Sequence, residues 1–331
     1  MKESANPAPT VMGEGNWRFQ VIHDWGELPG EVRYGNTHGV AEDSAGNIYV
    51  FHTVHETSPS RDAMVVFNRE GQFVTSWGSE FAGGAHGLHL QREGDSEFLY
   101  LCDIARNLVV KTTLEGREVL RLGYPSESEA YQPKTGAPAG PKYDEQGQVK
   151  YKPTNVAVAP NGDIYVADGY GSHHINRYTK EGQYLQTFGG PGQEPGQLMC
   201  PHGIMVDTRA QPARVLVADR SNNRLQYFSL EGEHLGFAHG VELPCHFAAW
   251  NGMLAVPDLV GKVTLLDQNN QVLLHLGTGA SDFRDRRKLS RDHFLPGKFV
   301  SPHSACFDRS GDIFVVEWVE IGRVSKLVRL R

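Results

Sequence analysis

Histidine recurs at one position of a short phrase that opens six strand-like segments of the chain. The occupants of that position are His38, His86, Asn155, His202, His246 and His303. Because the chain has 15 histidines among 331 residues, six positions chosen at random would hold fewer than one on average. Three imidazoles around one point form a catalytic zinc arrangement, which leaves a coordination position for water or substrate.

The six phrases are 44 to 69 residues apart, a spacing typical of repeated supersecondary units. Each phrase opens an apolar strand. A glycine turn follows, as at residues 44–47, 160–163 and 309–312, and then a β-branched and aromatic strand such as residues 164–167. Two more strands around a second glycine turn complete the unit. Six units of four antiparallel strands predict an all-β fold, a six-bladed β-propeller.

The two ends of the chain are predicted to meet in the last blade. Residues 19–26 resemble a fourth strand and match residues 73–78, while the last unit has only three strands before Arg331. An N-terminal strand that completes this blade removes two open sheet edges. We therefore expect one propeller domain over residues 1–331, with residues 1–16 as a flexible N-terminal segment.

Composition limits the partners. The chain has 32 basic and 39 acidic residues, a net charge of −7 and no run of Lys or Arg, which argues against nucleic acid. It has no apolar run long enough for a bilayer and no signal-peptide pattern, so we expect no membrane partner and a cytoplasmic location by default. Four cysteines are too few for a disulfide scaffold. We expect a monomer that acts on a small molecule or peptide.

One face of the ring is predicted to carry the function. Strand direction alternates, so the six repeated positions share a face with the loops that follow the second strand of each blade. Insertions at residues 55–61, 124–150 and 279–300 fall on that same face. Long loops in a compact fold are commonly binding loops. We expect a site where the central channel opens on this face.

Alternate blades stand one third of a turn apart, so His86, His202 and His303 are predicted to converge as a transition-metal site. The repeated positions of the other three blades form a second triangle, His38, Asn155 and His246. We expect these side chains to bind substrate or to orient water. The alternative is that all six side chains fill a narrow polar channel, satisfied by water and without a metal.

Tyr170 and Arg220 follow repeated aspartates in neighbouring loops of this face. Beside a metal, a tyrosine can act as a base because the cation lowers its pKa, and an arginine can hold a carboxylate or an oxyanion. Alternatively, they are a loop aromatic and a surface ion-pair partner. The repeated acids are expected to close the loops by accepting backbone hydrogen bonds, and they are Asp103, Asp168, Asp219, Asp258 and Glu317.

Several segments resemble NHL repeats, namely residues 153–158, 166–170, 201–203, 218–226 and 302–303. Over residues 39–326 the chain resembles the peptidyl-α-hydroxyglycine α-amidating lyases. The resemblance implies Zn²⁺ on His86, His202 and His303, Tyr170 as base and Arg220 near the substrate. It also implies Ca²⁺ held partly by the backbone carbonyls of Val40 and Leu88. The implied reaction is cleavage of the C–N bond of a hydroxylated amide, with release of glyoxylate.

The chain departs from this family at two positions. Thr53 stands where the family has a substrate-binding arginine, and Ser304 stands where an aspartate would reach the calcium ion. We expect Thr53 to take the place of the arginine in the substrate site, and we expect the substrate itself to differ.

Two other classes of function stay open. A different metal chemistry on the same ring would be hydrolysis or hydration by a metal-bound hydroxide, or oxidation at Fe²⁺ or Cu²⁺ held by four or more histidines. A non-catalytic NHL interaction platform would bind no metal and would carry an exposed apolar or basic patch.

Overall fold

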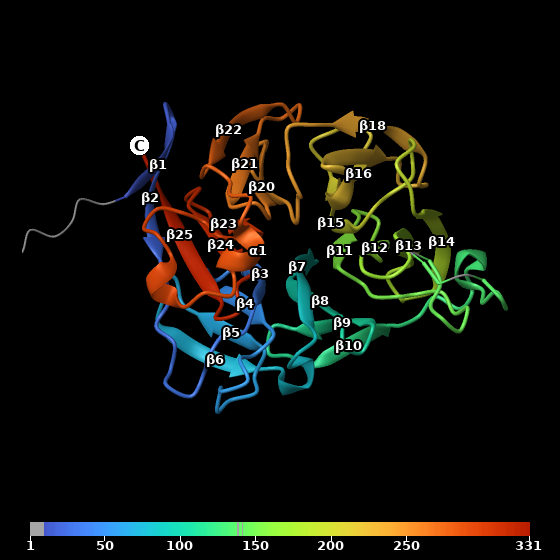
Figure 1. The fold of residues 1–331 in the computed structure, drawn as a ribbon, viewed down its shortest axis with the longest axis horizontal. Helices are drawn as coiled ribbons and strands as arrows, with labels where there is room; N and C mark the ends of the chain where they lie inside the picture. The colour runs from blue at the N-terminus through green and yellow to red at the C-terminus, as the bar shows by residue number, and fades with distance from the viewer. Residues whose placement is uncertain (1–9, 138, 141) are drawn as a thin grey trace, which may run out of the picture.

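The computed structural model describes residues 10–137, 139–140 and 142–331. Six antiparallel sheets stand around a central axis, as Figure 1 shows. Five of the sheets have four strands and one has five. The prediction of a six-bladed β-propeller is confirmed.

The first three blades follow the chain in order. Blade 1 contains β3 (Thr37–Glu42), β4 (Ile48–His52), β5 (Met64–Phe67) and β6 (Phe73–Trp77). Blade 2 contains β7 (Ala85–Glu93), β8 (Ser96–Asp103), β9 (Leu108–Thr113) and β10 (Glu118–Leu122). Blade 3 contains β11 (Asn155–Val158), β12 (Ile164–Ala167), β13 (His174–Tyr178) and β14 (Tyr184–Gly189).

The remaining blades repeat the pattern. Blade 4 contains β15 (Pro201–Asp207), β16 (Arg214–Asp219), β17 (Arg224–Phe228) and β18 (His234–Ala238). Blade 5 contains β19 (Ala248–Trp250), β20 (Met253–Asp258), β21 (Lys262–Leu266) and β22 (Val272–Leu276). Blade 6 contains β23 (Pro302–Phe307), β24 (Ile313–Glu317), β25 (Arg323–Leu330), β2 (Trp17–His23) and β1 (Val11–Glu14).

Helical structure among the described residues is confined to short turns in the connections. One α-helical turn and four 3-10 turns occur, namely α1 (Phe283–Arg286), η1 (Ser79–Phe81), η2 (Glu129–Tyr131), η3 (Arg220–Asn222) and η4 (Arg291–His293). None of these helices is long or apolar enough to cross a membrane.

The ring closes through β2 and β25, which pair from Arg18 opposite Leu330 to His23 opposite Ser325. In Figure 1 the blue N-terminal strands lie beside the red C-terminal strand. The predicted closure is therefore present. Residues 11–14 of the expected flexible segment form β1, which makes a hairpin with β2 around Gly15; residues 1–9 lie outside the described residues.

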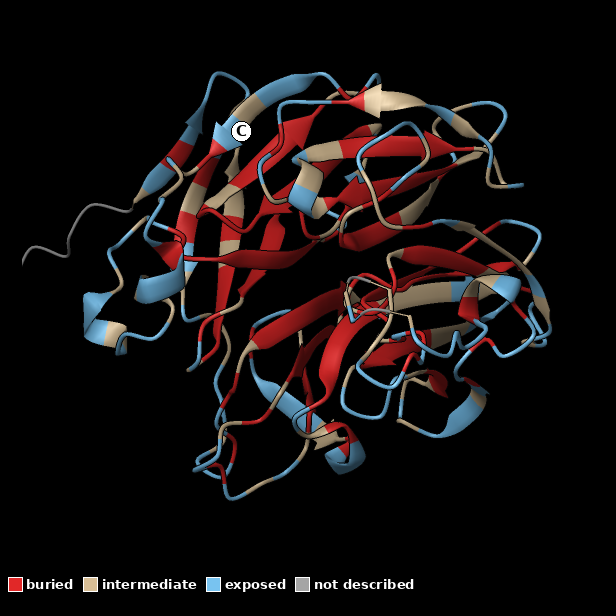
Figure 2. Cartoon of the chain, turned by 45° about the vertical axis from the view of Figure 1, so that its right-hand side comes forward, coloured by how far each residue is buried: buried red, intermediate tan, exposed pale blue. Residues whose placement is uncertain are grey.

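The second strand of each blade is mostly buried because neighbouring blades cover both of its faces. All five residues of β4 and all four of β12 are buried. Outer strands such as β6 expose most of their residues, and Figure 2 shows this change from red inner strands to blue edges. Packing between blades thus fixes the inner strands that line the channel.

The repeated acids hold the entry to each blade, as predicted. Asp168 accepts hydrogen bonds from the backbone of Lys152 and Ser172 at 2.6 and 2.8 Å, and Asp219 accepts one from Met199 at 2.7 Å. Equivalent bonds are made by Asp258, which accepts from Glu242 N, and by Glu317, which accepts from Val300 N. Asp103 instead accepts from Ala105 N within its own loop. In blades 3 to 6 the acid therefore binds the segment that comes directly before the repeated position.

Candidate functional site

Four of the six repeated positions lie in β-bulges of the innermost strands. On β3, Thr37 pairs with His52 and Gly39 pairs with Phe51, so His38 has no residue opposite it. The same register shift occurs at the histidine of β7, β15 and β23. A bulge re-aims the side chain of the extra residue. It turns His38, His86, His202 and His303 towards the axis.

The three histidines of alternate blades have one ring nitrogen held by a backbone carbonyl. Nδ1 of His86 lies 2.8 Å from Thr154 O, and Nδ1 of His202 lies 2.8 Å from Cys245 O. Nδ1 of His303 lies 2.9 Å from His38 O. Because a carbonyl only accepts, each Nδ1 must carry the proton, which places the lone pair on Nε2, the nitrogen that can bind a ligand. This is the arrangement of metal-binding histidines.

A glycine follows the histidine in three of these bulges, and close packing requires it in all three; a Cβ on Gly39 would clash with the Cβ of Leu88. A Cβ on Gly87 would lie 2.4 Å from Thr154 O, and a Cβ on Gly203 would lie 2.7 Å from Cys245 O. These are the same carbonyls that hold His86 and His202. The glycine therefore lets the next blade come close enough to fix the imidazole.

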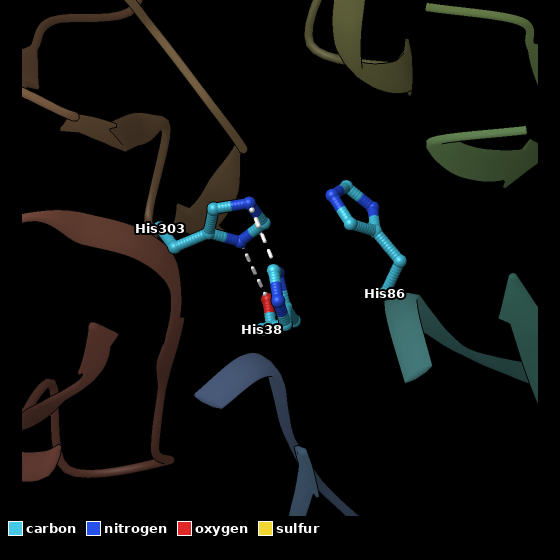
Figure 3. A group of neighbouring side chains, drawn as sticks. All are labelled: His38, His86 and His303. Atoms are coloured by element: carbon cyan, nitrogen blue, oxygen red, sulfur yellow. Dashed lines mark hydrogen bonds between the residues drawn. The ribbon is translucent and has the colours of Figure 1, made fainter. Parts of the chain in front are cut away.

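The four imidazoles meet at the axis. The rings of His86, His202 and His303 are 4.7 to 4.9 Å apart from centre to centre. His38 joins them, and its ring nitrogen lies within 4.8 Å of those of His86 and His303. Figure 3 shows His38 beside His303 and His86 facing them from another blade. The structure thus brings together the predicted triangle and one member of the second triangle.

All four imidazoles are held neutral. Burial, aided by the nearby guanidinium of Arg220, lowers the pKa of His86 to about 3. Burial, followed by the charges of neighbouring groups, holds the pKa of His38, His202 and His303 well below the ordinary value. Neutral imidazole is the form that binds a metal. The residues present therefore fit a transition-metal ion. The donor atoms that lie within 4.8 Å of one another are those of His38, His86 and His303, and the ring of His202 lies beside this group, 4.7 Å from that of His303.

Tyr170 and Arg220 lie beside these histidines. The phenol oxygen of Tyr170 is 3.2 Å from Nε2 of His86 and 3.0 Å from Nε2 of His202, and Nη1 of Arg220 donates to it at 3.2 Å. Burial raises the pKa of Tyr170 to about 12, and the charge of Arg220 opposes that rise. Both side chains, with Arg284 and His303, line a pocket of about 300 Å³.

Two members of the second triangle, Asn155 and His246, do not join the four axial imidazoles. The side-chain oxygen of Asn155 accepts a hydrogen bond from Val156 N at 2.9 Å, and Asn155 pairs in regular register with Ala167. His246 precedes β19 and lines a separate channel cavity of about 190 Å³. Val40 and Leu88, the expected calcium carbonyl residues, line that second cavity too.

Thr53 lies outside the pockets described above. Its hydroxyl accepts a hydrogen bond from Asn36 N at 3.0 Å, and its backbone NH donates to Asn36 O at 3.0 Å. The residue thus joins the segment before β3 to the loop after β4. The structure gives Thr53 a local structural task and shows no contact with the histidines or with Arg220.

Comparison with known proteins agrees with this fold. The NHL repeat family matches residues 151–178. Peptidyl-alpha-hydroxyglycine alpha-amidating lyase 1 of Drosophila melanogaster is 28% identical over 228 residues, which cover 60% of this chain but only 38% of that protein. NHL repeat-containing protein 3 of Homo sapiens is 27% identical over 234 residues, covering 67% of this chain and 61% of that protein.

Solved structures show the same architecture. A structure titled as streptogramin B lyase superposes with a TM-score of 0.59 at 12% identity, covering 95% of this chain and 99% of that one. At this identity the likeness concerns the fold. The chain is thus a six-bladed β-propeller with an NHL repeat, and it has curated relatives that are named amidating lyases.

Proposed function

We propose that this protein is a metal-dependent lyase of the amidating-lyase type, which cleaves the C–N bond of a hydroxylated amide. The observation that carries the proposal is the set of three alternate-blade histidines, each with Nδ1 on a backbone carbonyl and Nε2 towards the axis. The sequence similarity to a protein named as an amidating lyase supports the same reaction class.

His86, His202 and His303 would hold the metal ion, and His38 is placed to bind either the ion or the substrate. When bound, a divalent ion such as Zn²⁺ supplies Lewis acidity towards a substrate hydroxyl and lowers the pKa of a neighbouring phenol. Fe²⁺ and Cu²⁺ also accept imidazole ligands. A role for Ca²⁺ at the Val40 and Leu88 carbonyls is a separate, structural proposal.

Tyr170 and Arg220 have different roles in the proposed reaction. Tyr170, as phenolate, takes the proton of the substrate hydroxyl, and the C–O bond becomes a carbonyl. The electron pair of the C–N bond goes to the amide nitrogen, which takes the same proton from Tyr170 and leaves as a neutral amide, so that the phenolate is restored. Arg220 stabilises the phenolate because its guanidinium donates to the phenol oxygen.

A substrate carboxylate requires a cation in place of the family arginine, because Thr53 makes no contact there. Arg220 and Arg284 both line the pocket that contains His303. Arg284 comes from the insertion at residues 279–300 and is exposed, so it can approach a carboxylate without being already buried in an ion pair. We propose that these two arginines take the carboxylate.

The fourth imidazole supports a second candidate. His38 is 4.4 Å from His303 and 4.7 Å from His86 between ring centres, and a four-histidine centre suits Fe²⁺ or Cu²⁺. The second candidate is therefore oxidation at such a metal. Hydration or hydrolysis at the same centre belongs to this group, whereas an NHL interaction platform would need no metal.

The test combines elemental analysis with a substrate assay. Purified protein is analysed for Zn, Fe, Cu and Ca and is then incubated with α-hydroxyhippurate while glyoxylate and benzamide are measured. Stoichiometric release of both products supports the lyase. Absence of any bound transition metal would refute the metal centre and favour the platform. Iron or copper with oxidised product and no glyoxylate would favour the second candidate.

A further inference from the structure

A larger cavity lies on the other side of Tyr170. It has a volume of about 710 Å³ and lies between the loop after β8 and the connection from blade 2 to blade 3. Arg106, Lys150, Lys152 and Tyr170 are among its lining residues. Tyr170 also lines the 300 Å³ pocket with His303 and Arg220. One residue therefore lines both spaces, so a ligand in the larger cavity would contact Tyr170.

The size of this cavity exceeds the needs of the reacting group. Cavities of roughly 300 to 1,000 Å³ bind whole small-molecule ligands. The smaller pocket with His303 is already large enough for a short hydroxylated acid. The larger cavity is consequently available for the rest of the substrate, which in the proposed reaction is the acyl part that leaves as the amide.

Positive charge predominates around the cavity. Arg106, Lys150 and Lys152 face a single lining carboxylate, that of Asp144. Asp144 Oδ1 already accepts hydrogen bonds from the backbone of Gln146 and Gln148 at 2.9 and 2.8 Å. These two hydrogen bonds hold the Asp144 carboxylate within its own turn.

The positive charges of these side chains are only partly compensated by neighbouring carboxylates. Nε of Arg106 donates to buried Asp103 at 2.6 Å, which fixes that guanidinium in place. Nζ of Lys150 donates to the neutral carbonyl of Gly140 at 2.8 Å. Asp103 compensates the charge of Arg106 and Asp144 opposes one of the two lysines, so one lysine charge remains in excess to attract an anion.

The remaining wall is aromatic and aliphatic. Tyr124 and Tyr151 line the cavity together with Leu108 and Val149. The ring of Tyr124 is edge-on to Tyr131 at 5.5 Å and to Tyr151 at 6.0 Å. Such a wall packs against an apolar chain, while the cations bind its acidic end.

Lys152 connects this cavity to the candidate site through the backbone. Its NH donates to Asp168 at 2.6 Å, and its carbonyl accepts from Tyr170 N at 3.3 Å. The position of its side chain is therefore tied to the loop that carries the phenol.

We propose that this cavity binds the acyl part of the substrate and selects an acyl chain that ends in a carboxylate. The inference rests on the proposed function because it places the leaving amide of that reaction in the larger of the two cavities lined by Tyr170. It names the substrate class as an acidic acyl or acidic peptidyl amide. The carboxylate of the acyl chain is bound by the cations Lys150, Lys152 and Arg106. The aromatic wall packs against the part of the acyl chain that lies between the amide and this carboxylate.

The experiment measures binding of two product-like probes by isothermal titration calorimetry. The acidic probe is acetyl-Glu-Val-NH₂ and the neutral probe is acetyl-Gln-Val-NH₂, which have nearly the same shape. We expect the acidic probe to bind the wild type about tenfold more tightly, the effect of one charge-assisted contact. Equal affinities, or no binding of either probe, would overturn the proposal.

The variants locate the effect. Lys150→Met/Lys152→Met should bind the two probes equally, whereas Lys152→Arg should keep the preference. Lys180→Met is the matched control, because Lys180 lies in the turn between β13 and β14 and does not line the cavity. Its preference should equal that of the wild type. A preference that survives in the double variant, or disappears in Lys180→Met, contradicts the assignment.

Failure of the reaction and failure of this inference give different results. If the protein releases no glyoxylate but still prefers the acidic probe through Lys150 and Lys152, the proposed reaction is wrong and the binding site stands. If glyoxylate is released while the probes show no preference, the lyase stands and the acidic specificity is wrong.

Discussion

The phenol oxygen of Tyr170 lies 3.0 Å from Nε2 of His202. His202 Nδ1 is committed to a carbonyl, so its Nε2 can only accept, and Tyr170 supplies the proton. The same phenol accepts a hydrogen bond from Arg220. A group that bound Nε2 of His202 would therefore meet the phenol directly and would change its hydrogen bonding.

Replacement of Tyr170 by phenylalanine should abolish most turnover and leave the fold intact. The substitution removes the base and keeps the ring, and the loss of a general base typically costs about 10² to 10⁴ in rate. Turnover is measured by release of glyoxylate from the best substrate found, alongside the melting temperature and the metal content.

Tyr165→Phe is the matched control for this prediction. Tyr165 lies on β12, and its hydroxyl donates to Leu230 O at 2.8 Å, away from the histidines. It should keep nearly full turnover. A Tyr170→Phe variant with wild-type turnover would remove the phenol from the mechanism.

The alternate-blade histidines should determine metal content. A variant with His86, His202 and His303 all changed to alanine should lose the bound ion that the wild type carries at about one per chain, as in other three-histidine sites. Metal is measured by mass spectrometry of the dialysed protein. His246→Ala should keep its metal, because His246 lines another cavity. Unchanged metal in the triple variant would refute the assignment.

Gly203→Ala should weaken metal binding without touching a ligand. The new Cβ would lie 2.7 Å from Cys245 O and would push away the carbonyl that holds His202. Loss of such an orienting partner typically costs about 10- to 100-fold in metal affinity. Competition with a chelator measures the affinity. Gly30→Ala is the control, since a Cβ there meets no atom within 4 Å.

Asp258 should make a contribution to stability that declines between about pH 4 and pH 7. Burial raises the pKa of this carboxyl from 3.8 to about 7. The folded protein keeps a proton that the unfolded chain releases above its lower pKa, so this stabilisation is full below that pKa and is lost as the pH rises through the folded pKa. Buried histidines such as His86, whose pKa is lowered to about 3, act in the opposite sense, because the unfolded chain binds protons on them that the folded protein does not. Asp258→Asn removes only the decline, so its stability should rise more steeply with pH than that of the wild type in urea titrations.

The control for the pH effect is Asp95→Asn, because the side chain of Asp95 is fully exposed. Its pH profile should follow that of the wild type. A profile for Asp258→Asn that also follows the wild type would show that this carboxyl does not govern the decline.

The closing strand should be a main determinant of stability. Phe19 on β2 is fully buried and belongs to a core cluster with Ile313, Val315 and Leu327. Phe19→Ala should lower the free energy of unfolding by about 3–5 kcal/mol. Urea denaturation tests this value. Phe73→Ala on the outer strand β6, where the ring is 37% exposed, should cost much less, and equal costs would contradict closure by β2.

The number of blades and the axial position of the histidines could be predicted from the sequence, because each unit repeats the same strand and turn signals. Register could not be predicted in the same way. The phrase with His246 resembles the others, but Phe247 follows the histidine, and β19 begins only at Ala248. A glycine or serine after the histidine is the signal that marks the four bulged positions.

The roles of Thr53 and Asn155 depended on hydrogen bonds that the sequence does not show. Each side-chain oxygen accepts from a backbone NH, of Asn36 and of Val156 respectively. Short polar side chains often satisfy the local backbone in this way. The strand β1 was missed because Gly13 and Gly15 read as a break in the pattern, whereas their positive φ angles permit the hairpin.

Ring closure sets an order of events for a nascent chain. His23 on β2 and Ser325 on β25 are 302 positions apart and touch at 2.8 Å. At synthesis rates of about 5–20 residues per second, the first strand waits roughly 15–60 s for its partner. During this interval the edge of β2 and the side chain of Phe19 lack their final neighbours. Blades 1 to 5 can pack as they emerge, but the axial histidines are complete only when His303 arrives, so the proposed metal site is assembled at the end of folding.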